Sequence, residues 1–345
     1  MFRNIKRRRR TAVYGVKGAN GVIIVTTRRG KTGKITINFS ANFGMNELTS
    51  MIKSCNSYEW ALFRNQAIQN DGDPSKNNLL FNEEDLWKFL NHQDYTDQEM
   101  AEMGLSQSQM DRIRDQGAIY YTDHDWYKET YGKKGLQQQY NLNISGGTEK
   151  VRYFSSVGYF SQSGNFNNQD HYGGKKNDIN SYYNRYNIRT NIDADIFKNL
   201  TVSVNLSGEF TEDKGFLGEN NSTSDYNRYK SIRQYTYPPF AGPSILNGKM
   251  INYTNRNPIK SRMAGGPNGW TPVADLFSRS LQTTNKNMLF TNISVEHKFD
   301  YLLPGLSLKG TFAYNDTYKT GNYRSTQVPF YTADRSETDP SEIIY

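Results

Sequence analysis

The chain has 345 residues, a net charge of +8 and a mean hydropathy of −0.82, and 14% of its residues are aromatic. No apolar run approaches the ~18 residues that a membrane-spanning helix needs, so a helical membrane protein is excluded. A β-barrel is not excluded, because its strands alternate apolar and polar side chains and keep the average hydropathy low. The 25 Tyr and 18 Phe suit the aromatic girdles of a barrel, and equally a secreted β-sandwich or jelly roll.

Cysteine and charge exclude further classes. The single cysteine, Cys55, rules out an intramolecular disulfide and zinc sites of the Cys-x-x-Cys kind. Basic and acidic residues are mixed along most of the chain, so we predict no nucleic-acid partner. The basic run at residues 7–10 is not followed by the apolar segment of a signal peptide. We therefore expect residues 1–10 to be a non-native start that lies outside the fold.

The first element after this start is a glycine-punctuated turn that leads into an apolar strand. The strand runs from Val22 to Thr27 and ends at the basic turn Arg28-Arg29-Gly30. The glycines have the wrong spacing for either glycine-rich nucleotide motif, and a strand follows where a helix N-terminus is needed. Turn geometry explains these glycines better than nucleotide binding does.

Strict alternation begins at Lys34 and predicts a strand of about ten residues with one apolar face. The apolar side chains are Ile35, Ile37, Phe39, Ala41 and Phe43.

Residues 44–139 are predicted to form a small helical insertion. One helix is expected from Ser57 to Asn70 with Ser57 as its cap, and a second from Asn82 to Asn91 with Asn82 as its cap. A third covers Met100 to Arg114. The predicted buried stripes are Trp60, Phe63, Ala67 and Ile68 on the first helix, and Leu86, Phe89 and Leu90 on the second.

Six further segments repeat the two-residue alternation, so the chain is predicted to hold seven strands. The segments are 140–145, 151–159, 186–194, 202–210, 289–295 and 306–314. Short turns at 146–149, 195–199 and 300–305 alternate with long connections at 44–139, 161–185 and 211–287. An outer-membrane barrel alternates short periplasmic turns with long outer loops in this way, whereas a soluble sandwich has no reason to do so.

Two clusters of polar, charged side chains have simpler explanations than metal binding or catalysis. Asp123-His124-Asp125 offers three metal ligands, but neighbours in an extended segment point to opposite sides, so solvated loop residues are favoured over a calcium site. Glu83-Glu84 suits a helix N-terminus better than a glycosidase pair. We predict no catalytic residues, no metal and no cofactor.

Aromatic residues are concentrated between Tyr226 and Trp270. Flat rings stack on sugars and also pack the core of a loop, and the second explanation is favoured. The candidate ligand-binding residues in this loop are Tyr235, Tyr237 and Trp270.

The start of the chain resembles the end of the plug domain in the SusC/RagA family of TonB-linked outer-membrane transporters. The residues that carry the likeness are Tyr14, Gly15, Gly18, Ala19, Asn20, Gly21, Val22, Thr26, Thr27 and Gly30. The likeness continues through Ser57-Tyr58-Glu59, Asp125-Trp126-Tyr127 and the run from Gln139 to Phe154. Most of the plug, the signal peptide and the TonB-contacting segment of the family have no counterpart here.

The resemblance implies an all-β fold: a partial transmembrane antiparallel β-barrel of about seven strands from a larger plugged barrel of ~22. Residues 11–33 would be the C-terminal end of the plug domain, and residues 34–345 the N-terminal part of the barrel. The chain would thus be a fragment of a longer transporter.

The function implied by the resemblance is TonB-dependent import of oligomeric nutrients, glycans or less often peptides, across the bacterial outer membrane. The implied partners are a SusD-like surface lipoprotein, the TonB-ExbB-ExbD complex, outer-membrane lipid and the oligosaccharide or peptide substrate. Two alternatives stay open. One is a siderophore- or cobalamin-type receptor of the same architecture, and the other is a soluble secreted carbohydrate-binding β-protein.

Overall fold

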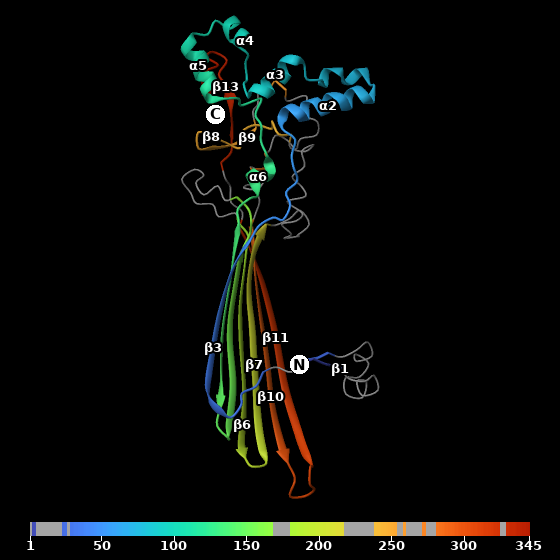
Figure 1. Ribbon diagram of the computed structural model, residues 1–345, viewed down its shortest axis with the longest axis vertical. Coiled ribbons are helices and arrows are strands. Elements are labelled where there is room, and N and C mark those ends of the chain that lie inside the picture. Colours follow the sequence, from blue (N-terminus) through green and yellow to red (C-terminus); the bar gives the residue numbers. More distant parts are fainter. Residues whose placement is uncertain are drawn as a thin grey trace.

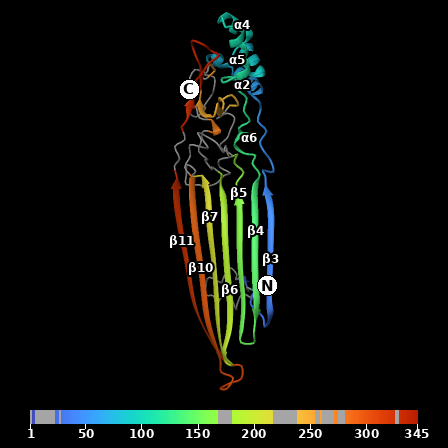
Figure 2. The same ribbon diagram turned by 90° about the vertical axis from the view of Figure 1, so that its left-hand side faces the viewer.

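The computed structural model describes residues 2–4, 23–25, 28–167, 180–216, 238–253, 258–259, 271–273, 281–324 and 329–345. Within these ranges the chain forms a long antiparallel sheet, with a group of short helices beyond one end of it (Figure 1). The view turned by 90° shows the strands side by side, with tight turns at the end opposite the helices (Figure 2).

The sheet contains the seven predicted strands in chain order, each antiparallel to its neighbours, which confirms the all-β fold class. The sheet does not close on itself: β3 and β11 are its two edges. The strands are β3 (Gly33–Asn46), β4 (Gly135–Gly147), β5 (Val151–Ser163), β6 (Tyr182–Phe197), β7 (Leu200–Phe216), β10 (Leu281–Lys298) and β11 (Ser307–Arg324).

Each strand is longer than its apolar pattern predicts, at 13 to 18 residues. The tight turn predicted within residues 195–199 is present but shorter than expected, because β6 continues to Phe197 and only two residues link it to β7. Asp195 is held in the strand by Arg152 (2.8 Å) and by the hydroxyl of Thr201 (2.7 Å). The alternation of apolar residues in the sequence does not predict these hydrogen bonds at the end of the strand.

The two faces of the sheet differ in chemistry. Apolar and polar side chains alternate along each strand, and the register places apolar residues beside apolar residues on neighbouring strands. On one face, neighbouring strands align large apolar side chains that remain about half exposed to solvent, such as Val157 (53%) and Ile188 (45%). The opposite face is mainly polar, although Phe154 and Phe290 also lie on it. One apolar row contains Tyr153, Ile192, Val204, Ile293 and Phe312, and the next row on the polar face contains Asn191, Asn205 and Asn292.

Aromatic side chains mark both ends of the apolar face. Near the helical end, Tyr140 stacks on Tyr159, which contacts Tyr186 with ring centroids 4.8 Å apart. Near the turns, Phe197 and Tyr301 are exposed by 66% and 69%. The apolar face is therefore a band between two aromatic rows.

The insertion between β3 and β4 is helical, as predicted. Its first helix, α2 (Ser57–Asp71), is capped by Asn56 rather than by Ser57, whose hydroxyl instead donates to the carbonyl of Thr122 (2.6 Å). The second, α3 (Glu83–Asn91), is capped by Asn82, which confirms the prediction. A short 3-10 turn at Pro74–Leu79 and helix α6 (Trp126–Thr130), capped by Asp125, complete this part.

The third predicted helix is wrong as a single element. It is two helices, α4 (Asp97–Glu102) and α5 (Gln107–Gln116), and Gly104 between them has a φ of 70°. Such a φ ends a helix. Ser106 then starts a new capping box with Gln109, so the side chains around the break favour two helices.

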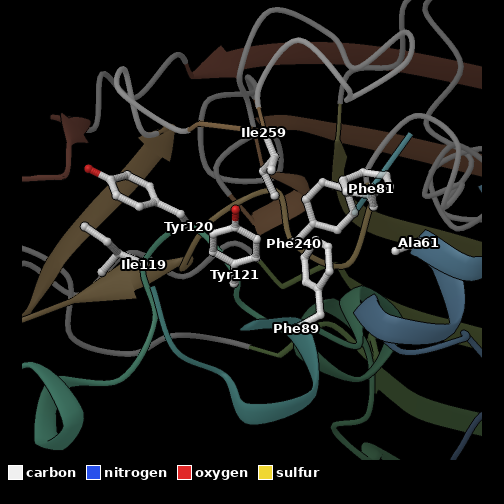
Figure 3. Close-up of a cluster of buried hydrophobic side chains, with 8 residues drawn as sticks. All are labelled: Ala61, Phe81, Phe89, Ile119, Tyr120, Tyr121, Phe240 and Ile259. Carbon is white, nitrogen blue, oxygen red and sulfur yellow. The ribbon is translucent and has the colours of Figure 1, made fainter. Parts of the chain in front are cut away.

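The helices pack on a core that includes distant parts of the chain (Figure 3). Phe240 is fully buried between Phe81 and Phe89, with ring centroids 5.8 and 4.9 Å away. The predicted stripes are wrong at Phe63, Ala67 and Leu90, which are exposed. The helices turn their faces toward Phe240 and Ile259, which lie far along the chain, so local periodicity could not identify the buried face.

A buried ion pair joins these helices to the last residues of the chain. Arg335 (1% exposed) pairs with Asp94 (0% exposed) at 2.7 Å and donates to the carbonyl of Gly117 at 2.7 Å. Asp94 also accepts the backbone N–H groups of Ile119 and Tyr120. We call the unit formed by α2–α6 and residues 334–341 the cap. Arg335 lies in β13 (Asp334–Arg335), which pairs with β14 (Ile343–Ile344).

Short strands complete the described structure. β8 (Ile245–Leu246), β9 (Lys249–Tyr253) and β12 (Tyr331–Thr332) form a small sheet near the cap. At the start of the chain, β1 (Phe2–Asn4) pairs with β2 (Ile23–Val25). That residues 1–10 are a non-native start stays a prediction. No helix in these described ranges is long and apolar enough to cross a membrane.

The cap is expected to lose stability in mild acid. Burial acts to raise the pKa of Glu99, but hydrogen bonds from Lys88 and from the Thr96 N–H outweigh it and lower that pKa. A lowered carboxylate pKa stabilises the fold above the unfolded pKa of about 4.3, and this stabilisation is lost as pH falls through the folded value. The urea concentration at the midpoint of cap unfolding should therefore decrease as the pH is lowered below about 5. In Glu99→Gln this part of the pH dependence should vanish, whereas an unchanged dependence would contradict the assignment.

Candidate functional site

The candidate functional site is the place where residues 28–34 meet the polar face of the sheet. These residues connect β2 to the start of β3. Asn191 of β6 donates from its amide to the carbonyl of Arg28 (2.7 Å). Arg29 forms an ion pair with Asp193, whose carboxylate also accepts from the hydroxyl of Ser203 (2.6 Å).

These contacts explain why three polar side chains of the sheet are buried. Asn191 is 3% exposed, Asp193 8% and Ser203 9%. A buried carboxylate needs a partner, and Arg29 and Ser203 supply it. We call residues 28–32 the docked segment.

Gly30 is the point of closest approach between the docked segment and the sheet. A Cβ atom at Gly30 would lie 2.3 Å from the backbone nitrogen of Tyr153 and 2.4 Å from its carbonyl oxygen. Tyr153 is paired on both sides, with Gly146 and Ile192, so its backbone cannot move away. Only glycine fits here.

Two hollows lie beside the docked segment on the polar face. One, of about 440 Å³, lies between Arg28 and the side chains of Phe154, Arg189, Glu209 and Phe290. The other, of about 490 Å³, is lined by residues 28–29 and 31–34 together with Asn38, Asn143, Ser145 and Phe154. Arg28 and Phe154 belong to both, so the two hollows adjoin.

The ion pair of Arg29 gives a direct test of the docked segment. Asp193→Asn should weaken the docking, because a charged hydrogen bond contributes about 1.5–3 kcal/mol before the partial exposure of Arg29 is discounted. We expect tryptic cleavage after Arg28 and Arg29, followed by mass spectrometry, to become roughly 3- to 10-fold faster. Asp195→Asn is the matched control, since Asp195 bonds Arg152 and not the docked segment. Equal rates for both variants would contradict this role of Asp193.

Most of the predicted site residues lie outside the described residues. This holds for Tyr14, Gly15, Gly18, Ala19, Asn20, Gly21, Val22, Thr26 and Thr27 of the plug-end motif, and for Tyr235, Tyr237 and Trp270 of the aromatic loop. Gly30 is described and contacts the sheet as set out above. Sequence reasoning missed Asn191, Asp193 and Ser203. The local signal for them is weak: two carboxylates, Asp193 and Asp195, follow Asn191, and a basic turn lies earlier in the chain.

The acidic clusters considered in the sequence have structural partners. Asp123 accepts from the N–H (2.8 Å) and the hydroxyl of Ser57, and His124 contacts Glu129 (2.5 Å). Asp125 caps α6, and Glu84 pairs with Lys88 (2.6 Å). In the described parts of the chain, no three His, Cys, Asp or Glu side chains gather in a way that could hold a metal ion.

Comparison with known proteins gives relatives but no family model that matches. TonB-dependent receptor P39 of Formosa agariphila is 23% identical over 312 residues, which cover 88% of this chain and 22% of the receptor. TonB-dependent receptor P3 of the same organism is 25% identical over 198 residues, which cover 57% of this chain and 14% of the receptor. The chain therefore spans about a fifth or less of these curated relatives.

Among solved structures, the RagAB peptide transporter aligns with 90% of this chain and 34% of its own, at 19% identity and a TM-score of 0.46. The structure of the RagAB peptide importer in the closed-closed state gives a TM-score of 0.45 over the same shares. By its similarity to these curated relatives, the chain is a homologue of TonB-dependent receptors. This confirms the resemblance to TonB-linked transporters that its glycine-rich start and its strand motifs indicate.

Proposed function

We propose that the seven-stranded sheet is part of the wall of an outer-membrane transport barrel, with its apolar face toward lipid and its polar face toward the lumen. The observation that carries the proposal is the height of the apolar band. Tyr186 and Phe197, at the two ends of the band on β6, are eleven residue steps apart along the strand. They span about 36 Å along the strand, or about 26 Å when the strand is tilted by about 45°. Barrels of the outer membrane carry an apolar band about 25 Å tall between aromatic girdles.

The exposed apolar face argues against the soluble alternative. Soluble proteins rarely leave a contiguous apolar surface uncovered, and here it extends over seven strands. The unpaired edges β3 and β11 would pair with further strands in a complete barrel, because open edges are not tolerated in lipid.

In this proposal the docked segment is the end of a plug that closes the lumen. Residues 11–33, including the plug-end motif, would form the C-terminal end of the plug domain, and residues from 34 onward the barrel. The contacts of Arg29 and Gly30 with the polar face support this division, because they lie on the lumenal side of the proposed wall. TonB, energised through ExbB and ExbD, would act on the plug of the longer protein.

The transported molecules would be oligomeric nutrients, glycans or peptides, delivered by a SusD-like lipoprotein above the cap. The cap supports this arrangement because it is a folded unit beyond the end of the sheet opposite the short turns, where outer loops of a barrel lie. The large helical insertion favours this function over that of a siderophore- or cobalamin-type receptor. The aromatic residues Tyr235, Tyr237 and Trp270 remain proposed ligand contacts.

The test is membrane fractionation combined with uptake in the bacterium that carries the gene. We expect the protein in the outer-membrane fraction, released only by detergent. Deletion of the gene should abolish uptake of one class of labelled oligomer, and an uncoupler that collapses the proton gradient should do the same. A protein that partitions into buffer, or uptake that survives deletion for both glycan and peptide pools, would contradict the proposal.

A further inference from the structure

We infer that the two hollows beside the docked segment bind carboxylate groups, so that the imported oligomer is anionic. The inference rests on the proposed import function and goes beyond it by assigning the charge of the substrate and the residues that recognise it.

The first support is the charge of the lining. Five basic side chains and one carboxylate line the two hollows: Arg28, Arg29, Lys31, Lys34, Arg189 and Glu209. Arg29 is engaged by Asp193. Glu209 accepts from the amide of Asn187 (3.1 Å) when that amide is turned to satisfy both of its neighbours. The hollows therefore hold a clear excess of positive charge.

The second support is that most of these basic side chains have no partner within the described part of the protein. Among the residues that the structure describes, the side chains of Arg28, Lys31, Lys34 and Arg189 form no hydrogen bond or ion pair. A guanidinium presents a rigid fork of donors that matches both oxygens of a carboxylate. A neutral ligand could accept hydrogen bonds from these side chains but would leave their positive charge uncompensated, whereas a carboxylate also neutralises it.

The third support is the arrangement around Arg189. It lies on β6 directly between Ser156 and Ser207 of the neighbouring strands, and both serines line the same hollow. Their hydroxyls suit the polar groups of an oligomer, as do Asn38 and Asn143 in the second hollow. Phe154 lies at the boundary of the two and offers a ring face. Each volume is within the range of about 300–1,000 Å³ that is typical of ligand sites.

The position of the site couples binding to the docked segment. Arg28 belongs to that segment, whereas Arg189 belongs to the sheet. A carboxylate held by both would bridge the two parts and stabilise the docking. Bound ligand should therefore slow tryptic cleavage after Arg28, in addition to giving a binding signal.

The experiment measures binding by calorimetry in detergent at about 0.15 M salt, where distant charges are largely screened. The probes are trigalacturonate and triglutamate, with galactotriose and triglutamine as their neutral counterparts. We expect at least one acidic probe to bind and the neutral ones to bind at least about 10-fold more weakly. The acidic probe that binds distinguishes a uronic-acid glycan from an acidic peptide as the source of the carboxylate.

Arg189→Gln should weaken binding of the acidic probe about 10-fold or more. Lys309→Gln is the matched control, because it removes one positive charge from β11, outside both hollows. Equal weakening by both variants, neutral probes that bind as tightly, or no binding of any probe at roughly 10 mM would overturn the inference. A protein found in the outer membrane that imports only neutral oligomers would overturn this inference and leave the proposed function intact.

Discussion

Arg335→Met is expected to destabilise the cap by about 3–5 kcal/mol, the usual cost of leaving one partner of a buried ion pair alone. The Asp94 side chain is fully buried and would keep only backbone N–H partners. Arg335 also holds the side chain of Gln116 and the carbonyl groups of Gly117 and Pro340. The loss is comparable with the total stability of a small domain, so the cap should unfold at much lower urea concentrations.

Tryptophan fluorescence reports this unfolding, because Trp60, Trp87 and Trp126 all lie in the cap. Arg114→Gln is the control: Arg114 pairs with Asp97 and Asp111 at the surface, and its loss should leave the urea midpoint almost unchanged. Arg335→Lys should fall between the two, since an ammonium cannot make the same set of forked bonds. A midpoint for Arg335→Met that matches Arg114→Gln would show that the buried pair does not hold the cap together.

Gly30→Ala is expected to lift the docked segment off the sheet. The new methyl group would lie within 2.6 Å of three backbone atoms of Tyr153, far inside any real contact. Because the backbone of the sheet cannot move away at Tyr153, the docked segment must be displaced instead. Arg29 and Asn191 then lose their partners. Overpacking of this kind costs about 1–3 kcal/mol, which corresponds to a roughly 5- to 150-fold rise in tryptic cleavage after Arg28 and Arg29.

Gly44→Ala is the matched control for this variant. Gly44 also lies on the polar face of the sheet, but a Cβ atom there would meet only the side chain of Gln137 at an ordinary 3.7 Å. Gly44→Ala should be cleaved by trypsin at the same rate as the unchanged protein. If Gly30→Ala is cleaved no faster than Gly44→Ala, the docked segment does not depend on close contact with Tyr153.

The sheet was predictable because its signal is local. Alternation at Ile35, Ile37 and Phe39 is repeated in every strand, and the short turns fix which strands are neighbours. The full strand lengths were not predictable, since Asp195 stays in the ladder through bonds to residues on other strands. The break at Gly104 shows a similar limit: helical periodicity continued across a glycine whose positive φ ends the helix.

The cap core and the docked segment were beyond sequence reasoning for one shared reason. Both depend on contacts between residues far apart in the chain, such as Phe89 with Phe240 and Arg29 with Asp193. The buried face of α2 was expected to include Phe63, but the core that contains Phe240 packs against the other side of that helix. Gly30 was predicted as part of a family motif, and the structure supplies the physical reason for a glycine there.

The most direct test of the central claim, that the sheet is a membrane wall with one lipid face, uses single cysteines along β7. The native Cys55 is first replaced by serine, so that each introduced thiol is the only one. One set replaces Val202, Val204 and Leu206 on the apolar face, and the other replaces Thr201, Asn205 and Ser207 on the polar face. Ser203 is left in place because it is buried and bonds Asp193.

We expect labelled cysteines of the apolar set to be quenched by a lipid-borne quencher and to react slowly with a water-soluble thiol reagent. Cysteines of the polar set should react quickly with that reagent and should escape the quencher. The environment should therefore change between neighbouring positions of the strand, because successive side chains point to opposite faces. Equal access of the water-soluble reagent to both sets of cysteines would contradict the claim.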